Sequence, residues 1–530
     1  MLAPTEQLPA GPAGPVEDHI DALMREARRR TRRRRVRRFL AVALLIGIGS
    51  AGYALLSGGS NGVIVETTTH PYANLRAFKG EGELAFISRG QVWALDGDRG
   101  TLRRLPVPAG FTPSSPVLSH DGRWLSYLVA RSQNIDGPYE LWIAHADGSD
   151  AHQVRGLTVN QLVGWSPSTD LVAVEAGESK HVPYGSPTSL DLVSPPGRVR
   201  VLFQRSSPRT LARLGAIRSA VWSPGGQSLA VSTYSPEPYA GTQIFDVPVA
   251  VGARRVLWFS FRNPRRLTGA LSCGPHCGDD DAIAQLAGWW PNWGIAFWVF
   301  SSGMNRNADS TPLAVIARPG AQPRGVTQTL SDGTTDAVNA GPDGELAVVE
   351  STASSGREYA VGKEVERCSP TTVSCTALPR DSIWTAQPLS CKPCFGAPAT
   401  GPGSAVSLDP AWSPDGTLLA YAKAPAYHAA AGPSLAWYRS HQLYVWDSRT
   451  DSTRRVGAIS GTSLPTWSRD SKSLLYVSGD SLWMTNSATG KAVEIEHPLY
   501  SESAWDNVGT NGLAFYGQIP WKAQFSWHSS

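Results

Sequence analysis

One short motif recurs along the chain in related spellings, and it limits the fold more than any other feature. Its clearest copy is AWSPDGTLLAYA, residues 411–422; others are VWSPGGQSLAVS from Val221, TWSRDSKSLLYVS from Thr466 and LSHDGRWLSYL from Leu118. An apolar residue and Trp end one strand, Ser-Pro begins a turn with φ preset by proline, and Asp-Gly supplies the residue with positive φ. Because an alternating apolar run follows, each copy predicts a β-hairpin.

The copies recur at a regular interval, which indicates one repeat array. An interval of about 55 residues suits a four-stranded propeller blade with insertions. The sequence therefore predicts an all-β protein over residues 81–530, a β-propeller of seven or eight blades with eight slightly favoured. The residues before the turn Ser, or its equivalent, are Leu118, Trp165, Trp222, Trp290, Ala340, Trp412, Trp467 and Trp505.

Partial units at the two ends of the array predict how the ring closes. The sequence GELAFISRGQVWALDGDRGTLRRL from Gly82 contains the later strands of a unit without its Trp-Ser-Pro start. The sequence AWDNVGTNGLAFYG from Ala504 contains the start with little after it. We expect these halves to complete one blade, because closure removes exposed sheet edges.

The motif, followed by an apolar strand and an aromatic strand such as QLYVWDS from Gln442, resembles the WD40-like PD40 repeats of the TolB-type β-propellers. The resemblance covers roughly residues 82–516 and is most specific from Trp412 to Tyr421. It implies the propeller fold. TolB, as the family implies, is a periplasmic six-bladed propeller behind a small α/β domain that works through protein partners. This chain has more units and an apolar N-terminal segment, so the resemblance extends to the fold and not to the TolB role.

An arginine-rich segment precedes an apolar one near the N-terminus. Ten arginines fall within REARRRTRRRRVRR, residues 25–38, directly before FLAVALLIGIGSAGYALL, residues 39–56. As a helix with a rise of roughly 1.5 Å per residue, the apolar run spans about 27 Å, near the thickness of a bilayer core. Arginine on the amino side predicts a cytoplasmic N-terminus and an extracytoplasmic remainder.

These features predict a single-pass cell-membrane protein that contacts the lipid bilayer through residues 39–57, a transmembrane signal anchor. Residues 1–38 are then a cytoplasmic segment and residues 58–80 an extracytoplasmic linker. A cleaved signal peptide is the alternative, because Gly52-Tyr53-Ala54 has the small-x-small pattern of a cleavage site. Beyond residue 38 the chain has 38 basic and 39 acidic side chains. This balance predicts no nucleic-acid partner.

The six cysteines form three neighbouring couples, all after the apolar segment. An even number in an oxidising compartment predicts local disulfides, and we expect them to pin loops that protrude from the blades. Zinc is an alternative for CGPHC, which contains His276, and for CKPC; a redox pair is a further alternative for CKPC. The couples are Cys273 and Cys277, Cys368 and Cys375, and Cys391 and Cys394.

No motif predicts a catalytic residue, a metal ligand or a cofactor. GGSNG, residues 58–62, matches a nucleophile elbow only in spelling, because an elbow needs a strand before it and a helix after it. Asp279, Asp280 and Asp281 favour a solvated loop, with calcium binding as the alternative. The acidic and glycine residues of the repeat are interpreted as structural turn residues: Asp121, Gly122, Asp343, Gly344, Asp415, Gly416 and Asp470.

Tryptophan is denser in GWWPNWGIAFWVF, residues 288–300, than the repeat requires. Trp289, Trp293 and Trp298 suggest a platform for a sugar ring or for an apolar anchor of a partner, and core packing is the alternative.

The sequence favours a non-enzymatic scaffold or binding module that holds a partner protein of the cell envelope, a role that rests on analogy between folds. A lyase or hydrolase acting on an envelope polysaccharide, with its site at the propeller channel, is one alternative, and the sensor ectodomain of a signalling complex is another. Ionisable side chains that converge at one channel mouth would favour catalysis, whereas an apolar rim would favour binding.

Overall fold

A computed structural model describes most of the chain after residue 69. The described ranges are 70–131, 138–178, 187–204, 216–235, 241–261, 282–301, 310–330, 338–351, 363–371, 374–378, 405–425, 439–457, 460–499 and 521–530. Within these ranges no helix has the length and apolar character needed to cross a membrane. The predicted membrane segment, residues 39–57, lies outside them.

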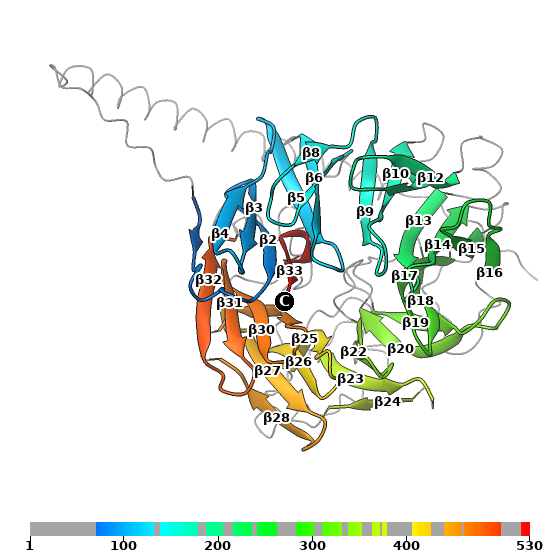
Figure 1. Ribbon diagram of the computed structural model, residues 1–530. Coiled ribbons are helices and arrows are strands. Elements are labelled where there is room, and N and C mark those ends of the chain that lie inside the picture. The colour runs from blue at the N-terminus through cyan, green and yellow to red at the C-terminus, as the bar shows by residue number, and fades with distance from the viewer. Residues whose placement is uncertain are drawn as a thin grey trace, which may run out of the picture. The chain divides into compact units, whose positions relative to one another are not determined.

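The described strands form eight blades arranged around a central axis, and the strands within each blade pair antiparallel (Figure 1). Single residue pairs between blades 5 and 6 and between blades 6 and 7 join these three blades into one continuous sheet. The prediction of an all-β propeller is confirmed, and the number of blades is eight. Blade 1 contains β33 (Phe525–His528), β2 (Glu83–Ser88), β3 (Gln91–Asp96) and β4 (Thr101–Arg104), and blade 2 contains β5 (Phe111–Leu118), β6 (Trp124–Arg131), β7 (Glu140–His145) and β8 (His152–Gln153). Blade 3 contains β9 (Val159–Trp165), β10 (Val172–Glu178), β11 (Pro187–Val193) and β12 (Val199–Gln204), and blade 4 contains β13 (Ala216–Trp222), β14 (Ser228–Ser235), β15 (Gly241–Pro248) and β16 (Val256–Phe261).

The remaining four blades follow the same order from the inner strand to the outer strand. Blade 5 contains β17 (Ala282–Trp290), β18 (Gly294–Ser301), β19 (Ser310–Ile316) and β20 (Arg324–Leu330), and blade 6 contains β21 (Val338–Ala340), β22 (Leu346–Ser351), β23 (Lys363–Ser369) and β24 (Ser374–Ala377). Blade 7 contains β25 (Ala405–Trp412), β26 (Leu418–Pro425), β27 (Gln442–Asp447) and β28 (Ser452–Arg455). Blade 8 contains β29 (Thr462–Trp467), β30 (Ser473–Ser478), β31 (Ser481–Asn486) and β32 (Ala492–His497), with the short β1 (Tyr72–Ala73) at its outer edge.

The ring closes through the C-terminal strand. β33 follows a 3₁₀ turn, Trp521–Ala523, and pairs with β2 from Phe525 opposite Phe86 to His528 opposite Glu83. Blade 1 therefore combines both ends of the array, as the partial units predict. The strand that closes it lies further along the chain than expected, because FSWH supplies the inner strand. The start predicted at Trp505 lies outside the described residues.

Three of the repeat turns are held by their own serine and aspartate. Ser119 Oγ donates to Asp121 Oδ1 at 2.7 Å and accepts the backbone N–H of Trp124 at 2.9 Å, so one hydroxyl joins both ends of the turn. Ser413 with Asp415 and Ser468 with Asp470 form the same bond at 2.6 and 2.7 Å. The Ser-x-Asp spelling of the repeat thus encodes a local hydrogen-bond network.

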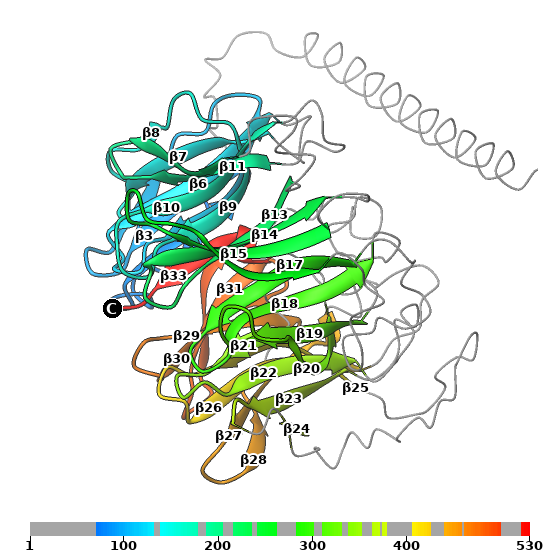
Figure 2. The ribbon, with the colours of Figure 1, turned by 90° about the vertical axis from the view of Figure 1, so that its right-hand side faces the viewer.

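The turn glycines also determine how neighbouring blades approach one another. Gly122 has φ of 69°, and a Cβ atom there would overlap the imidazole of His528 in β33. Figure 2 shows the C-terminus at one end of the ring, which is therefore the end that carries the repeat turns.

We expect Gly122→Ala to lower the free energy of unfolding by about 2 to 4 kcal/mol, because strain from positive φ adds to a clash with the closing strand. The matched control is Gly100→Ala, where φ is 63° and nothing lies within 4 Å of the added methyl group. That variant should lose only the backbone contribution, about 1 to 2 kcal/mol. Denaturant unfolding of both variants measures the difference, and equal losses would contradict the proposed contact.

The hydrophobic core lies between blades. One cluster joins Ala85 and Ala94 of blade 1 to Leu125 and Tyr127 of blade 2, and comparable clusters occupy the next junctions. Three of the repeat tryptophans add a polar contact to this packing: the indole Nε1 of each of these three donates to a backbone carbonyl of the preceding blade. These bonds are Trp165 to Val117 at 2.9 Å, Trp222 to Gly164 at 3.0 Å and Trp467 to Ala411 at 2.8 Å.

Candidate functional site

The repeat aspartates lie in turns, and their carboxylates bond within the turn. Burial acts to raise the pKa of Asp121, but hydrogen bonds from Ser119 and Arg123 outweigh it and lower the pKa to about 2. The same local bonds lower the pKa of Asp415 and Asp470. Gly344 and Gly416 adopt positive φ after Asp343 and Asp415, while Ser471 takes this place after Asp470 with φ of 61°.

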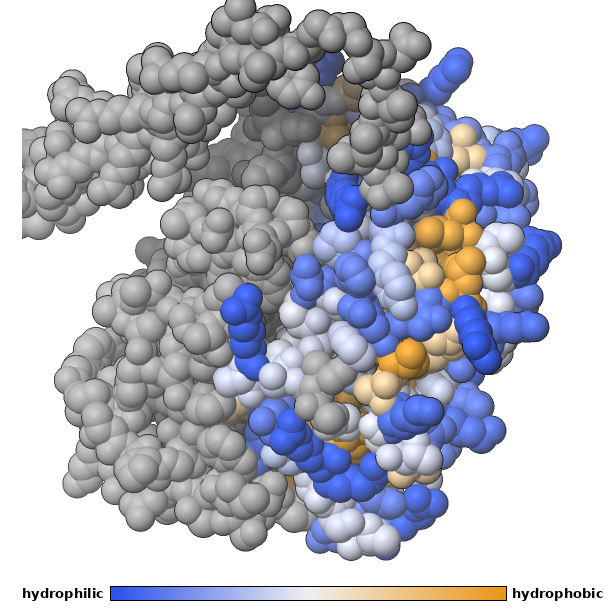
Figure 3. Space-filling view, turned by 90° about the vertical axis from the view of Figure 1, so that its left-hand side faces the viewer, coloured by the Kyte–Doolittle hydropathy of each residue, from blue (hydrophilic) through white to orange (hydrophobic). Residues whose placement is uncertain are grey.

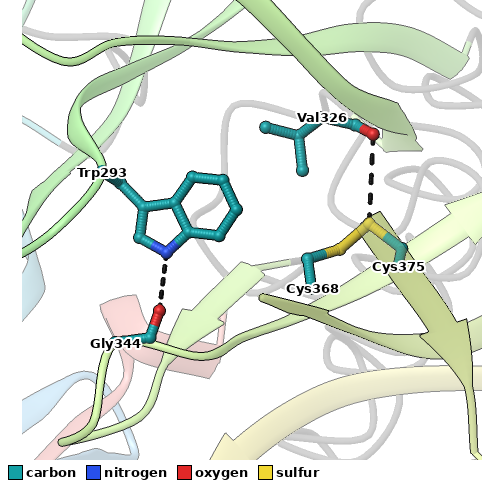
Figure 4. Close-up of a disulfide and its surroundings, with 5 residues drawn as sticks. All are labelled: Trp293, Val326, Gly344, Cys368 and Cys375. Carbon is teal, nitrogen blue, oxygen red and sulfur yellow. Dashed lines mark hydrogen bonds between the residues drawn. A yellow bond between two sulfur atoms is a disulfide. The ribbon is translucent and has the colours of Figure 1, made fainter. Parts of the chain in front are cut away.

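The tryptophans considered as a platform lie mainly in the core. Trp293 and Trp298 are each 1% exposed, and Trp293 Nε1 donates to the carbonyl of Gly344 in the next blade at 2.6 Å (Figure 4). Trp289 packs edge to face on Trp258, with ring centroids 5.1 Å apart. Trp293 and Trp298 therefore fill space between strands, as in the core-packing alternative, and present no ring face to a ligand.

One predicted cysteine couple is a disulfide. Cys368 of β23 and Cys375 of β24 lie directly opposite each other and are bonded within blade 6. The Cys375 sulfur lies 3.9 Å from the carbonyl oxygen of Val326 (Figure 4); because a disulfide sulfur has no hydrogen to donate, this is a packing contact. The expectation that this couple pins a protruding loop is corrected, since it joins the two outer strands of a blade. Cys273, Cys277, Cys391, Cys394 and Asp279 to Asp281 lie outside the described residues.

A buried carboxyl group lies at the junction of blades 3 and 4. Glu175 of β10 is 2% exposed, and the backbone N–H of Ala220 in β13 donates to its carboxyl group. Burial raises the pKa of Glu175 to about 7, against the opposing effects of this hydrogen bond and of the Arg218 charge. No sequence motif marks Glu175, and the one signal for it is an acidic residue inside the apolar strand VAVEA, residues 172–176.

At other junctions between blades, neutral side chains accept a backbone N–H of the neighbouring inner strand, as Glu175 does at the junction of blades 3 and 4. Ser526 Oγ accepts the N–H of Leu118 at 3.1 Å, Ser219 Oγ accepts that of Leu286 at 2.8 Å, and Asn339 Oδ1 accepts that of Trp412 at 2.9 Å. Inner strands have one edge without a partner strand, so these side chains satisfy backbone groups there. We interpret Glu175 as a member of this set. Across the part of the chain that the structure describes, no three His, Cys, Asp or Glu side chains are grouped to hold a metal ion.

Exposed aliphatic side chains gather on the outer strands of blades 3 and 4. Five of the seven large hydrophobic residues that are exposed in the described ranges lie there. The outer surface near blades 8 and 1, seen in Figure 3, is by contrast mostly hydrophilic with small hydrophobic patches. The five residues are Val199 and Val201 of β12, Val251 of the β15–β16 turn, and Val256 and Leu257 of β16.

A groove of about 390 Å³ lies among these residues, between β12 and the segment 247–255. We call it the lateral groove. Val201 and Val251, which line it, are 48% and 87% exposed. Phe203 and Val247 line it as well and are almost completely buried, so they connect it to the core between the blades. A concave site with exposed aliphatic side chains and a buried base is typical of a binding surface.

The fold defines the class of protein: an eight-bladed β-propeller. No family model and no curated protein matches the chain. Among solved structures it is similar to an oligogalacturonate lyase in complex with manganese, at 13% identity and a TM-score of 0.41, over 80% of this chain and 100% of that one. It is similar to a prolyl endopeptidase at 12% and 0.41, over 82% and 61%, and to a putative TolB from Agrobacterium tumefaciens at 13% and 0.28, over 57% and 84%. These similarities extend to the propeller fold alone.

The comparisons correct one expectation. The chain was expected not to be an enzyme, on the ground that repeat propellers of this kind act as binding modules. A lyase and a peptidase are among the proteins with similar propellers. The fold therefore gives no reason to exclude catalysis.

Proposed function

We propose that this protein is a membrane-anchored, extracytoplasmic β-propeller that binds a protein partner of the cell envelope through the lateral groove. The observation that carries the proposal is the concentration of exposed aliphatic side chains at this one place, next to a groove whose base is core. An isolated exposed aliphatic side chain is ordinary, whereas a contiguous group is typical of an interaction site.

Two features of the chain support the proposed location. The apolar run of residues 39–56 follows ten arginines, the pattern of an anchor with a cytoplasmic N-terminus. The disulfide between Cys368 and Cys375 fits an oxidising compartment outside the cytoplasm. A propeller tethered in this way would hold its partner close to the membrane.

The aliphatic side chains at the lateral groove differ from the ionisable side chains of the repeat turns. The ionisable repeat residues at the turn end of the ring are committed to local bonds: Asp121 to Ser119 and Arg123, and Asp470 to Ser468 and Lys472. The exposed valines at the groove have no polar side-chain atoms, so burying them against another protein is favourable, at about 25 cal/mol per Å² of apolar area.

Site-specific photo-cross-linking in native membranes tests this function. A benzophenone amino acid replaces Val201 in the groove of the full-length protein, and in a control it replaces Thr489, an exposed residue of the turn between β31 and β32 in blade 8. We expect one reproducible adduct with an envelope protein from position 201 and none from position 489, identified by mass spectrometry. The same adducts from both positions, or no intermolecular adduct from position 201, would show that the groove does not bind a protein.

A further inference from the structure

Arginines supply the charge among the described residues that line the lateral groove. Arg200 and Arg255 line it, and no carboxylate is among its lining residues. Arg198, directly before β12, and Arg254, next to Arg255 in the sequence, are also exposed. Two arginines in the lining and two more next to lining segments in the sequence create a local potential that attracts negative charge, although the chain beyond residue 38 is nearly neutral.

Contacts with the blades hold two of these guanidinium groups at the groove. Arg200 Nη2 donates to the carbonyl of Val249 at 2.8 Å and so joins blade 3 to blade 4. The Arg255 guanidinium lies over the rings of Phe203 and Phe245, at 5.4 and 5.6 Å from their centroids. An arginine side chain has five N–H donors, so each group retains donors for a carboxylate after making these contacts.

The size and edges of the groove limit what binds in it. Its volume is at the lower end of the roughly 300–1,000 Å³ of ligand pockets, which suits one or two side chains and not a folded surface. β12 pairs with β11 alone, so its outer edge is open, but its register shifts where Leu190 and Asp191 face Phe203 and Val201. A bulge of this kind disrupts strand addition, so side chains are expected to dominate recognition.

We propose that the lateral groove recognises an acidic protein segment: one aliphatic side chain of the segment enters between Val201 and Val251, and flanking carboxylates pair with the four arginines. This inference rests on the proposed function and adds the chemistry of the partner. Charge pairs at such a rim contribute specificity and association rate, while the buried aliphatic anchor contributes most of the affinity.

Peptide binding to the full-length protein in detergent tests the inference. The probe is a fluorescent peptide that alternates Glu and Val, with a Lys-Val peptide and a Glu-Ser peptide as controls, and fluorescence anisotropy is measured at low salt. We expect the Glu-Val peptide to bind at least tenfold more tightly than either control and to weaken as salt rises, because screening acts on exposed charges.

Charge reversal on the protein provides the matched test. Arg198→Glu combined with Arg254→Glu should weaken binding of the Glu-Val peptide about tenfold. The control combines Arg104→Glu and Arg455→Glu, which are exposed on the outer strands of blades 1 and 7; it should leave the affinity unchanged. Equal binding of the Glu-Val and Lys-Val peptides, or equal loss in both double variants, would overturn the acidic segment as ligand.

Two further outcomes separate this inference from the function on which it rests. If vesicles of phosphatidylglycerol bind the protein through Arg198 and Arg254 and the peptide does not bind, the ligand is a lipid surface and the inference is wrong. If position 201 yields a protein adduct in membranes but the peptide shows no preference for charge, the inference is wrong and the proposed function remains. Absence of the adduct overturns the function itself.

Discussion

Deletion of Phe525–Ser530 will open the ring and lower the free energy of unfolding by at least about 4 kcal/mol, the cost of losing one large buried aromatic residue. Phe525 is 5% exposed and pairs with Phe86, and Trp527 Nε1 donates to the carbonyl of Glu81 at 2.8 Å. The deletion also exposes the paired edge of β2, a strand that is buried almost throughout. An exposed apolar strand edge promotes association between chains.

The measurement is guanidinium unfolding of the full chain in detergent, followed by tryptophan fluorescence, with size-exclusion chromatography to detect association. Deletion of Ser530 alone is the control. It removes a single hydrogen bond, from Ser530 Oγ to the carbonyl of Gly80 at 2.6 Å, and should lower the free energy of unfolding by no more than about 1.5 kcal/mol. A synthetic peptide of residues 521–530 should restore part of the stability of the longer deletion. Equal stability of both deletions would show that β33 does not close the ring.

Glu175→Gln should stabilise the protein by about 3 kcal/mol at pH 8 and leave its stability almost unchanged at pH 4. Burial raises the pKa of Glu175 from 4.5 to about 7, so between these values the folded protein binds a proton that the unfolded chain has released. The contribution of this carboxyl group is therefore fully present below pH 4.5 and is lost as pH rises through 7. Gln remains neutral and still offers an oxygen to the N–H of Ala220.

Denaturant unfolding from pH 4 to pH 8 gives the free energy of unfolding at each pH. The effect is the difference between the wild-type protein and the variant in the slope of this free energy against pH. Glu140→Gln, in the half-buried first position of β7, is the control and should leave the slope as it is. Parallel curves for the wild-type protein and Glu175→Gln would contradict the assignment of a buried, neutral carboxyl group. A variant that is less stable at every pH would show that Arg218 needs the negative charge.

Local features of the sequence predicted the greater part of the fold. A turn such as Ser413-Pro-Asp-Gly forms from bonds among residues close in the chain, and seven of the predicted repeat starts end an inner strand, Leu118 of β5 among them. The eighth inner strand escaped prediction because FSWH does not have the motif; His528 occupies the place of the repeat tryptophan. Its role follows from pairing with β2, across almost the whole length of the propeller.

The sequence by itself determined the unit and its repetition, because turn chemistry and strand alternation act between neighbouring residues. It also determined which residue types fill the blades. Only the tertiary structure decided how the repeat units pack against and hydrogen-bond to one another. Closure of the ring directs the Trp165 indole to a carbonyl of the preceding blade and encloses Glu175 against Ala220. It also brings Val201 and Val251 to one groove. These contacts join residues of different blades, and their burial and charge depend on the packed ring, which no local pattern specifies.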